Sequence, residues 1–400
     1  MSSSLHKTLT PMTQWPAIVV FAALPTVGLV AGPSYAVLIF GLAVVQLAQG
    51  VFVNGRSTTV AIDPALCLLA AGFATLCWAS MSWSIDPTHS LHGALQVTAI
   101  MVGALALLAA LPPTYETTDL LLRVLVIATI LGATIIVADS LFSYRFEAWV
   151  TGRTNVTAAT KYNRGIDYLG LIAWPQFAFL ALRRRYRETV LLAVCLLAIL
   201  LIGASLAARV AAVSGVLVFA LAFWLPRIVA PLLACSTTVL AAGLPFALRV
   251  MANHRAALAP YLKPSGLQRL EIWDYMTARV FEHPLLGWGI AAANAVPVTP
   301  AEISSYVFRD TPGTYPHNQW LELWVETGAV GAALGLAFAL VVIHRIQRVA
   351  APSRPFAYAA FASAVAVSCV NFELTTDSWW AAMAATSFLF VIISHHIGPR

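Results

Sequence analysis

Long apolar segments follow one another along almost the whole chain, and they constrain its fold more than any other feature. Sixty per cent of the 400 residues are hydrophobic and ten per cent are charged, whereas about a quarter of the residues in a soluble domain are charged. Apolar runs of about 20 residues can cross a bilayer as helices, which satisfy their own backbone hydrogen bonds. The runs are too long and too evenly apolar for barrel strands of roughly ten alternating residues. The sequence therefore predicts an all-α polytopic membrane protein.

We expect about twelve transmembrane helices. The run that starts at Pro16 carries Pro25 and Gly28 and leads directly into the next run, so we interpret it as a retained first span and not a cleavable signal. An even number of spans places both termini on one side of the membrane. The predicted spans cover 16–32, 34–53, 64–82, 93–111, 119–142, 166–182, 189–204, 210–226, 228–248, 318–343, 356–371 and 379–396.

Basic residues in short loops predict the orientation of the bundle. The densest cluster is Arg183-Arg184-Arg185-Tyr186-Arg187, between the sixth and seventh spans, and we assign its side to the cytoplasm. Both termini then face the cytoplasm, together with Lys7, Arg56, Arg227, Arg345, Arg348, Arg354 and Arg400. The opposite, outer face receives the segments 83–92, 143–165, 205–209, 249–317 and 372–378.

One insertion between the ninth and tenth spans divides the chain into three parts. These parts are 1–248 with nine spans, 249–317 as a subdomain outside the membrane with amphipathic helices, and 318–400 with three spans and a cytoplasmic tail. Within the insertion, Ser265 is expected to cap a helix that lies over the mouth of the bundle, although ordinary interfacial packing gives the same pattern. His283-Pro284 should end that helix, because the residue before proline disfavours the helical conformation. One face of the helix carries Leu270, Trp273, Thr277 and Phe281.

The outer segments carry more cations than the positive-inside rule favours. These cations are Arg145, Arg153, Lys161, Arg164, Arg209, Arg249, Arg255, Lys263, Arg269, Arg279 and Arg309. Some have local acids as partners, giving a solvated surface of mixed charge; these acids are Glu147, Glu271, Asp274 and Glu282. The remaining cations suggest an anionic ligand on the outer face, and a phosphate is the simplest one.

Two arginines are candidates for binding this anion. Arg209 has no acid near it in the sequence, and its planar guanidinium suits bidentate contact with a phosphate. The alternative is that Arg209 only reaches the lipid headgroups. For Arg269 the alternative is an ordinary ion pair, because Glu271 and Asp274 are close enough in sequence to pair with it. This alternative is stronger than the one for Arg209.

His317 lies where a polar segment enters the tenth predicted span, and Pro316 before it fits the start of a helix. Ionisable groups at the edge of a bilayer are costly and are therefore functional candidates. His317 can accept a proton near neutral pH, although a lone histidine in this position is as often structural. Glu322 and Glu326 follow at spacings that match no HExxH pattern, and there is no cluster of His and Cys. We expect no metal and no cofactor.

Three segments resemble the O-antigen ligase and polymerase superfamily of bacterial inner-membrane glycosyltransferases, over roughly residues 80–390. They are the turn Ser205–Arg209; Arg269-Leu270-Glu271-Ile272-Trp273 followed by His283-Pro284-Leu285-Leu286-Gly287-Trp288-Gly289; and Pro316-His317-Asn318 with Glu322, Glu326, Gly328 and Gly331. Less specific matches are Trp83-Ser84-Ile85-Asp86-Pro87 and Asn163-Arg164-Gly165. Ala208 departs from the family pattern, in which serine often precedes the arginine, and this weakens the first segment.

The resemblance implies an inverting, metal-independent transfer of a glycan from an undecaprenyl diphosphate donor. In the ligase branch the acceptor is a sugar hydroxyl of lipid A–core, in lipopolysaccharide biosynthesis. Arg209 and Arg269 would hold the donor diphosphate, and His317 would lie at the reaction centre. Possible supporting residues are Arg164, Trp273, Asn318, Glu322 and Glu326. Glu322 or Glu326 would orient His317, while a salt bridge with an arginine is an equally good interpretation of Glu326.

The implied location is the bacterial inner membrane, with the active site at the periplasmic face. The implied partners are the lipid-linked donor, the lipid A–core acceptor and membrane lipids, and no nucleic acid. The chemistry agrees with the residues, because two arginines can stabilise a departing diphosphate without a divalent ion. A neutral His317 can remove the acceptor proton, and attack opposite the diphosphate inverts the sugar.

Other functions remain open at this stage. An O-antigen polymerase or a protein O-oligosaccharyltransferase would share these motifs, and Asn163-Arg164-Gly165 after a basic outer loop only weakly favours the ligase. A lipid or solute transporter would place charges near the bilayer midplane, whereas the informative charges here gather at one face. A purely structural membrane subunit would leave the outer cations unexplained.

Overall fold

The computed structural model describes residues 15–54, 62–110, 115–152, 160–308 and 314–396, which fold into helices without strands. Each predicted span coincides with one helix in this part of the chain. The helices are α2 (Trp15–Val30), α3 (Ser34–Asn54), α4 (Pro64–Ser80), α5 (Pro87–Ala109), α6 (Tyr115–Leu141), α8 (Asn163–Leu182), α9 (Tyr186–Ile202), α10 (Leu206–Trp224), α11 (Val229–Asn253), α15 (Gln319–Ile346), α16 (Arg354–Ser368) and α17 (Asp377–His396). The predicted loop cations Lys7, Arg56, Arg153, Arg309 and Arg400 lie outside the described residues.

Seven of the described helices are long and apolar enough to cross a membrane, namely α5, α6, α8, α10, α11, α15 and α17. Helices α2, α3 and α4 are apolar but shorter. The lipid-facing character is plain on α10, where Val213, Val216 and Leu217 are about 60% exposed. An all-helical, multi-pass membrane protein is therefore confirmed, while the number of twelve spans and their orientation stay predictions.

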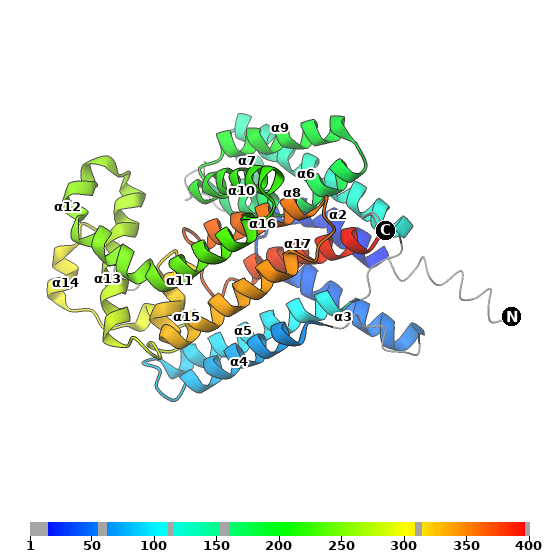
Figure 1. Cartoon of the computed structure of the whole chain (residues 1–400). Coiled ribbons are helices and arrows are strands. Elements are labelled where there is room, and N and C mark those ends of the chain that lie inside the picture. The colour runs from blue at the N-terminus through cyan, green and yellow to red at the C-terminus, as the bar shows by residue number, and fades with distance from the viewer. Residues whose placement is uncertain (1–14, 55–61, 111–114, 153–159, 309–313, 397–400) are drawn as a thin grey trace.

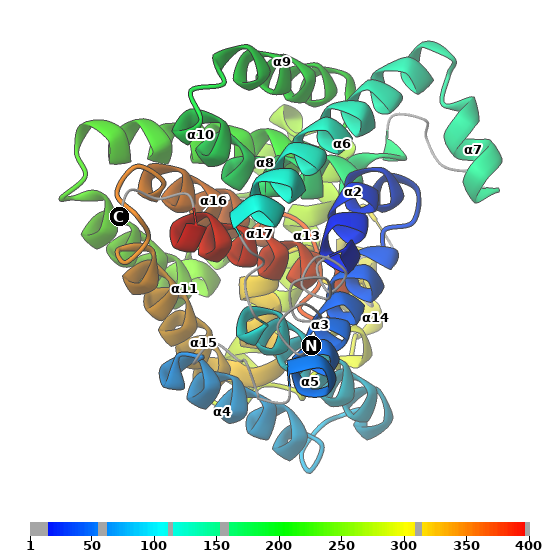
Figure 2. The same cartoon turned by 90° about the vertical axis from the view of Figure 1, so that its right-hand side faces the viewer.

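The centre of the bundle is formed by α8 and α17. The apolar stretch of α8 is 78% buried and that of α17 67%, against 28% for α10. Figure 2 shows α16 and α17 in the middle of the bundle, with α6 and α9 on one side and α4 and α5 on the other. Because α8 meets protein on almost every side, it can carry polar groups such as Gln176, whose amide donates to Thr129 Oγ1 at 2.9 Å.

Small residues allow α10 and α16 to approach each other closely. A Cβ on Gly215 of α10 would lie 2.4 Å from Ser363 Oγ and from the Trp174 ring. Trp174 donates to Ser363 Oγ at 3.0 Å, and Ser363 in turn donates to the carbonyl of Ala211 at 2.9 Å. This hydrogen-bonded contact joins α8, α10 and α16, as expected for helices that pack through small and polar residues.

The insertion forms a helical subdomain at one end of the bundle. Its helices α12 (Arg255–Leu258), α13 (Pro264–Glu282) and α14 (Pro300–Ser305) lie together at the left of Figure 1. The prediction that His283-Pro284 ends α13 is confirmed, because His283 is its C-cap. The prediction that Ser265 caps α13 is wrong: Lys263 is the N-cap and Pro264 the first residue, since proline has no N–H to lose at that position.

The predicted face of α13 is also partly wrong. Leu270 and Thr277 of that face are buried, but so are Ile272 and Met276 of the neighbouring stripe, whereas Phe281 is 45% exposed and its ring meets that of Phe246. Helical periodicity finds a stripe of apolar residues, but on a helix of mixed composition it does not decide which stripe meets the neighbouring helices.

The segments assigned to the outer face meet in space, which confirms that they share one end of the bundle. Ile85 N–H donates to the Trp288 carbonyl at 3.2 Å, and Ser90 Oγ donates to the Ile290 carbonyl at 2.6 Å. Leu374 N–H donates to Glu322 at 2.7 Å. Several of the predicted cytoplasmic arginines likewise pair with acids at helix starts, since Arg183 lies 2.7 Å from Asp119 and Arg345 pairs with Asp63.

Helix α15 is broken at Gly328, where φ is 63° and ψ is −160°. The segment 284–289 lies across this break and pairs with its backbone. Ala329 N–H donates to the Pro284 carbonyl and Val330 N–H to the Leu285 carbonyl, while Trp288 and Gly289 N–H donate to the carbonyls of Val325 and Glu326. The break therefore keeps its backbone hydrogen bonds, which a membrane-embedded chain requires.

We predict that Gly328→Ala destabilises the protein strongly. The positive φ alone costs about 1–3 kcal/mol for a residue with a side chain, and a Cβ at Gly328 would lie 2.3 Å from the Leu285 backbone. Gly170→Ala on α8 is the matched control, because its Cβ would meet nothing within 4 Å. Thermal unfolding in detergent should show a lower Tm for Gly328→Ala only; equal Tm values would contradict this account of the break.

Candidate active site

His317 lies in a turn immediately before α15. The helix begins at Gln319, and Asn318 caps it by accepting a hydrogen bond from Leu321 N–H at 3.1 Å. The expectation that Pro316 starts this helix is wrong, because His317 has a φ of 51° and the chain turns there before the helix begins. Such a left-handed conformation is uncommon for residues other than glycine and is costly outside a supporting structure.

The turn is held from the side by α13. Trp273 Nε1 donates to the Pro316 carbonyl at 2.8 Å, which links the supporting residue Trp273 directly to the residue before His317. The His317 ring also lies against Tyr315, with 4.0 Å between the ring centroids. Trp273, Tyr315 and the Asn318 cap together fix the position of the imidazole.

The imidazole of His317 is half-buried and has a free nitrogen. Its Nδ1 is buried and has no hydrogen-bond partner among the described residues. The pKa of His317 is lowered from 6.5 to about 4, first by burial and then by the positive charges of Arg269 and Arg164. His317 is therefore neutral at pH 7, and no described residue uses its Nδ1.

Arg269, on α13, lies beside His317 without the acidic partners that its sequence neighbours suggested. Glu271 accepts hydrogen bonds from Val307 and Phe308 N–H at 2.9 and 3.0 Å, and Asp274 pairs with Arg249 and Arg255. Burial lowers the pKa of Arg269. Within the described part of the chain, no carboxylate lies within ion-pair distance of Arg269.

Arg164, at the start of α8, is the second arginine near His317. Its charge lowers the pKa of His317, and its side chain hydrogen-bonds to Tyr315. The sequence ranked Arg164 only as a supporting residue. Its signal was the basic Asn163-Arg164-Gly165 motif at the outer end of a span, but no sequence pattern shows which outer segments meet.

Arg209 occupies a different environment from the one expected. Its Nε donates to the Leu200 carbonyl at 3.0 Å and its Nη2 to the Gly203 carbonyl at 2.6 Å, so it contacts the last carbonyls of α9. Its side chain is otherwise exposed, and its charge is not among the causes of the His317 shift. The role of Arg209 in donor binding stays a prediction.

Asp167 on α8 connects the Arg209 turn with the site. Its buried carboxylate accepts hydrogen bonds from Ser205 Oγ at 2.7 Å and Asn371 Nδ2 at 2.8 Å, and it interacts electrostatically with Arg164 and Arg269. Sequence reasoning missed Asp167, which lies at the beginning of an apolar span, three residues after Arg164. It also missed Glu373, a half-buried acid whose pKa burial raises and Arg164 lowers.

Neither glutamate of α15 orients His317. Glu322 accepts from Leu374 N–H, and Glu326 Oε1 accepts from Ala293 N–H at 3.4 Å. Both carboxylates are buried, and no described residue forms an ion pair with either. Glu326 Oε2 has no hydrogen-bond partner among the described residues. These two acids hold the 372–376 turn and the 291–293 segment against α15.

Metal-ligating side chains do not cluster in the described residues: no group of three or more His, Cys, Asp or Glu is placed to hold an ion. The site instead brings together one neutral imidazole and two guanidinium groups. This combination can bind an anion between the arginines and accept a proton next to it.

Comparisons with known proteins find similarity to polysaccharide ligases. Residues 191–336 match the family model described as O-antigen ligase. A Rickettsia bellii protein named "Putative polysaccharide ligase" is 24% identical over 364 residues, which cover 90% of this chain and 85% of that protein. Proteins with similar names from Rickettsia conorii and Rickettsia typhi are 24% and 25% identical, each over 54% of this chain and about half of their own length.

We predict that Arg269→Gln raises the pKa of His317 above about 4 and towards 6.5, because it removes a neighbouring positive charge. The histidine would then protonate at higher pH than in the wild type. NMR titration of isotope-labelled histidine in detergent measures this shift. Arg209→Gln should leave the titration unchanged; a shift of equal size in that variant would place Arg209 beside His317.

Proposed function

We propose, from the chain's membership of the O-antigen ligase superfamily, that it transfers a glycan from undecaprenyl diphosphate to a sugar hydroxyl of lipid A–core. The observation that carries the proposal is the neutral His317, whose Nδ1 has no partner among the described residues and whose pKa is lowered by the charges of Arg269 and Arg164. The active site would face the periplasm of a bacterial inner membrane.

In this proposal the two arginines hold the diphosphate. Arg269 has no carboxylate partner among the described residues, so binding a diphosphate there does not require an existing ion pair to break. Guanidinium groups bind phosphate oxygens bidentately, and fixed positive groups stabilise the charge that develops on a departing diphosphate. These residues would supply that charge without a divalent ion. Arg209 would add a third contact from the neighbouring turn.

His317 would act as the general base for the acceptor hydroxyl. A pKa of about 4 makes an isolated imidazole a weak base, but that value reflects burial and two uncompensated positive charges. A bound diphosphate neutralises these charges and therefore raises the pKa of His317. The base would thus gain strength when the donor is bound. The acceptor oxygen attacks the anomeric carbon, the bond to the diphosphate breaks with inversion, and a ring nitrogen of His317 takes the proton.

We predict that His317→Ala abolishes glycan transfer while leaving insertion and donor binding intact, since positioned general bases contribute about 10²–10⁴-fold. The variants would be expressed in a strain whose own copy of the gene is deleted, and lipopolysaccharide inspected on gels. The deletion strain should show core-lipid without long chains and should accumulate lipid-linked polymer. Wild type and His92→Ala, an exposed histidine of α5, should restore the long chains.

Two results would contradict this function. Full ligation by His317→Ala would remove its role as the base. Core-lipid that carries a single repeat in the deletion strain would indicate a polymerase instead of a ligase.

We also predict that Arg269→Ala weakens donor binding by about 1.5–3 kcal/mol, the usual worth of a hydrogen bond to a charged group. Arg269→Lys should retain only part of the donor affinity, because lysine lacks the forked guanidinium that makes two hydrogen bonds. Binding of a fluorescent undecaprenyl diphosphate glycan to purified protein measures this, with exposed Arg187→Ala as control. A chelator should leave the transfer activity unchanged. Loss of activity on chelation would point to a metal ion.

A further inference from the structure

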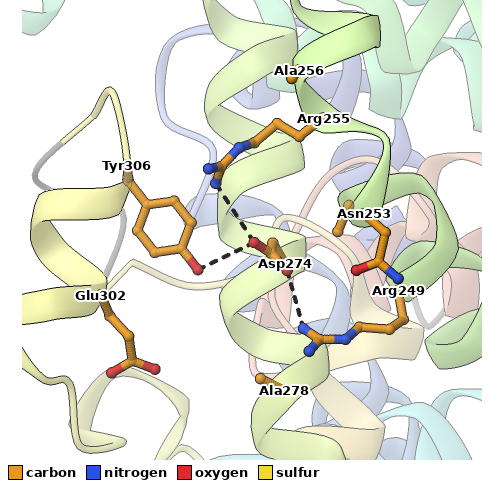
Figure 3. Close-up of a pocket in the computed structure, with 9 residues that line it drawn as sticks. Arg249, Asn253, Arg255, Ala256, Asp274, Ala278, Glu302 and Tyr306 are labelled. Carbon is orange, nitrogen blue, oxygen red and sulfur yellow. Dashed lines mark hydrogen bonds and ion pairs between the residues drawn. The ribbon is translucent and has the colours of Figure 1, made fainter.

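A polar pocket of about 450 Å³ lies between α11, α12, α13 and α14, on the subdomain outside the bundle. This volume falls within the usual range of small-molecule sites, about 300–1,000 Å³. Figure 3 shows Tyr306 and Glu302 on one side, Arg249 and Asn253 on the other, and Asp274 between them. None of these residues was singled out as a site residue by the sequence, and none contacts His317.

Two arginines of the pocket share one carboxylate. Arg249 Nη1 lies 3.1 Å from Asp274 Oδ1, and Arg255 Nη1 lies 3.6 Å from Asp274 Oδ2. The second distance is too long for a hydrogen bond, and the buried Nη1 of Arg255 has no hydrogen-bond partner among the described residues. One carboxylate between two guanidinium groups leaves a positive charge and unused N–H donors inside the pocket.

The other acid of the pocket is already paired. Glu302 pairs with Arg279 of α13 and accepts hydrogen bonds from the backbone and side chain of Thr299 at 2.8 Å in a capping box. Glu302 therefore holds α14 against α13 and does not neutralise Arg249 or Arg255. Arg279 also pairs with Glu282, so the positive charge of the pocket is that of Arg249 and Arg255, which only Asp274 offsets.

An aromatic ring and an amide complete the lining. The Arg255 guanidinium lies over the Tyr306 ring, 5.1 Å from its centroid, and Asn253 adds a side chain that both donates and accepts hydrogen bonds. Aromatic faces that meet C–H groups, together with forked N–H donors, suit a sugar that carries a phosphate or carboxylate. The hydroxyl groups of an uncharged sugar also accept hydrogen bonds from arginine, but only an anionic sugar accepts the stronger charge-assisted ones.

Helix α13 connects this pocket with the candidate active site. Trp273 contacts the His317 turn, and the next residue, Asp274, lines the pocket. Arg269 and Asp274 are separated by about 7.5 Å along the helix axis. The two side chains also point about 140° apart around that axis, so a glycan that meets both places has to pass around α13.

We propose that this pocket binds an anionic sugar, bearing a phosphate or carboxylate, of a glycan that reacts at His317. The reaction is the one proposed above, so this part of the inference rests on the proposed function. The anionic sugar belongs either to the acceptor or to the donor glycan, and the experiment separates the two sources.

The binding experiment uses purified full-length protein in detergent and two probes, glucose 6-phosphate and glucose, with affinities measured by ligand-observed NMR. The wild type should bind glucose 6-phosphate at least fivefold more tightly than glucose. Arg249→Gln and Arg255→Gln should each remove this preference. Lys263→Gln, an exposed cation of the same subdomain, and Arg269→Gln at the active site should retain it.

Two results would contradict the proposal that this pocket binds an anionic sugar. One is equal affinity of the wild type for both probes. The other is loss of the preference in Arg269→Gln together with its retention in the folded Arg249→Gln variant, because that pattern would place the phosphate at the active site. The Tm of each variant separates loss of binding from loss of folding, and Arg249 is exposed enough for its replacement to be tolerated.

A transfer assay then identifies the source of the anionic sugar. If Arg249→Gln raises KM for native acceptor but not for acceptor stripped of its phosphates, the sugar belongs to the acceptor; a raised KM for the donor alone assigns it to the donor. If Arg249→Gln leaves the KM values for donor and acceptor unchanged, the pocket does not bind a substrate of the reaction at His317. If the protein transfers no glycan but Arg249→Gln and Arg255→Gln still remove the preference for glucose 6-phosphate, the proposed function is wrong. The pocket is then still a binding site for an anionic sugar.

Discussion

The pairing of segment 284–289 with the break in α15 is the interaction on which the outer end of the molecule depends. Four backbone hydrogen bonds join the two, on both sides of Gly328. The same pairing fixes Gly289 against Ser84 and Trp288 over Ile85, so α5, α13 and α15 are held in one arrangement. The turn with His317 begins α15 and contacts α13 through Trp273. Its position therefore follows from this pairing.

Electrostatics at this end follow a simple division. Most acids are committed to other partners: Glu147 to Lys161, Asp274 to Arg249 and Arg255, and Glu302 to Arg279. Glu271 and Glu322 accept hydrogen bonds from backbone N–H groups. Arg269 and Arg164 are left beside a histidine that burial keeps neutral. Asp167 and Glu373 interact electrostatically with these arginines, but no described carboxylate lies within ion-pair distance of either one, so both remain able to bind an anion.

The sequence predicted the helices well and the contacts between them less well. Each predicted span coincides with a helix because apolar length is a property of the local sequence. The exposed face of α13, the acids that pair with its arginines and the position of Arg164 beside His317 depend on which segments meet in space. Glu271 shows the difference: it is two residues from Arg269, yet its carboxylate binds the backbone of Val307 and Phe308. Spacing in the sequence does not show whether a side chain contacts a close neighbour or a group 36 residues away.

The break in α15 also has a consequence for the order of events during biosynthesis. The segment that pairs with the break precedes α15 in the chain, so it leaves the ribosome before α15. Until the two meet, α15 carries unpaired backbone groups within an apolar helix, which lipid does not tolerate well. The backbone of α15 at Gly328 is therefore complete only when segment 284–289 has folded against it.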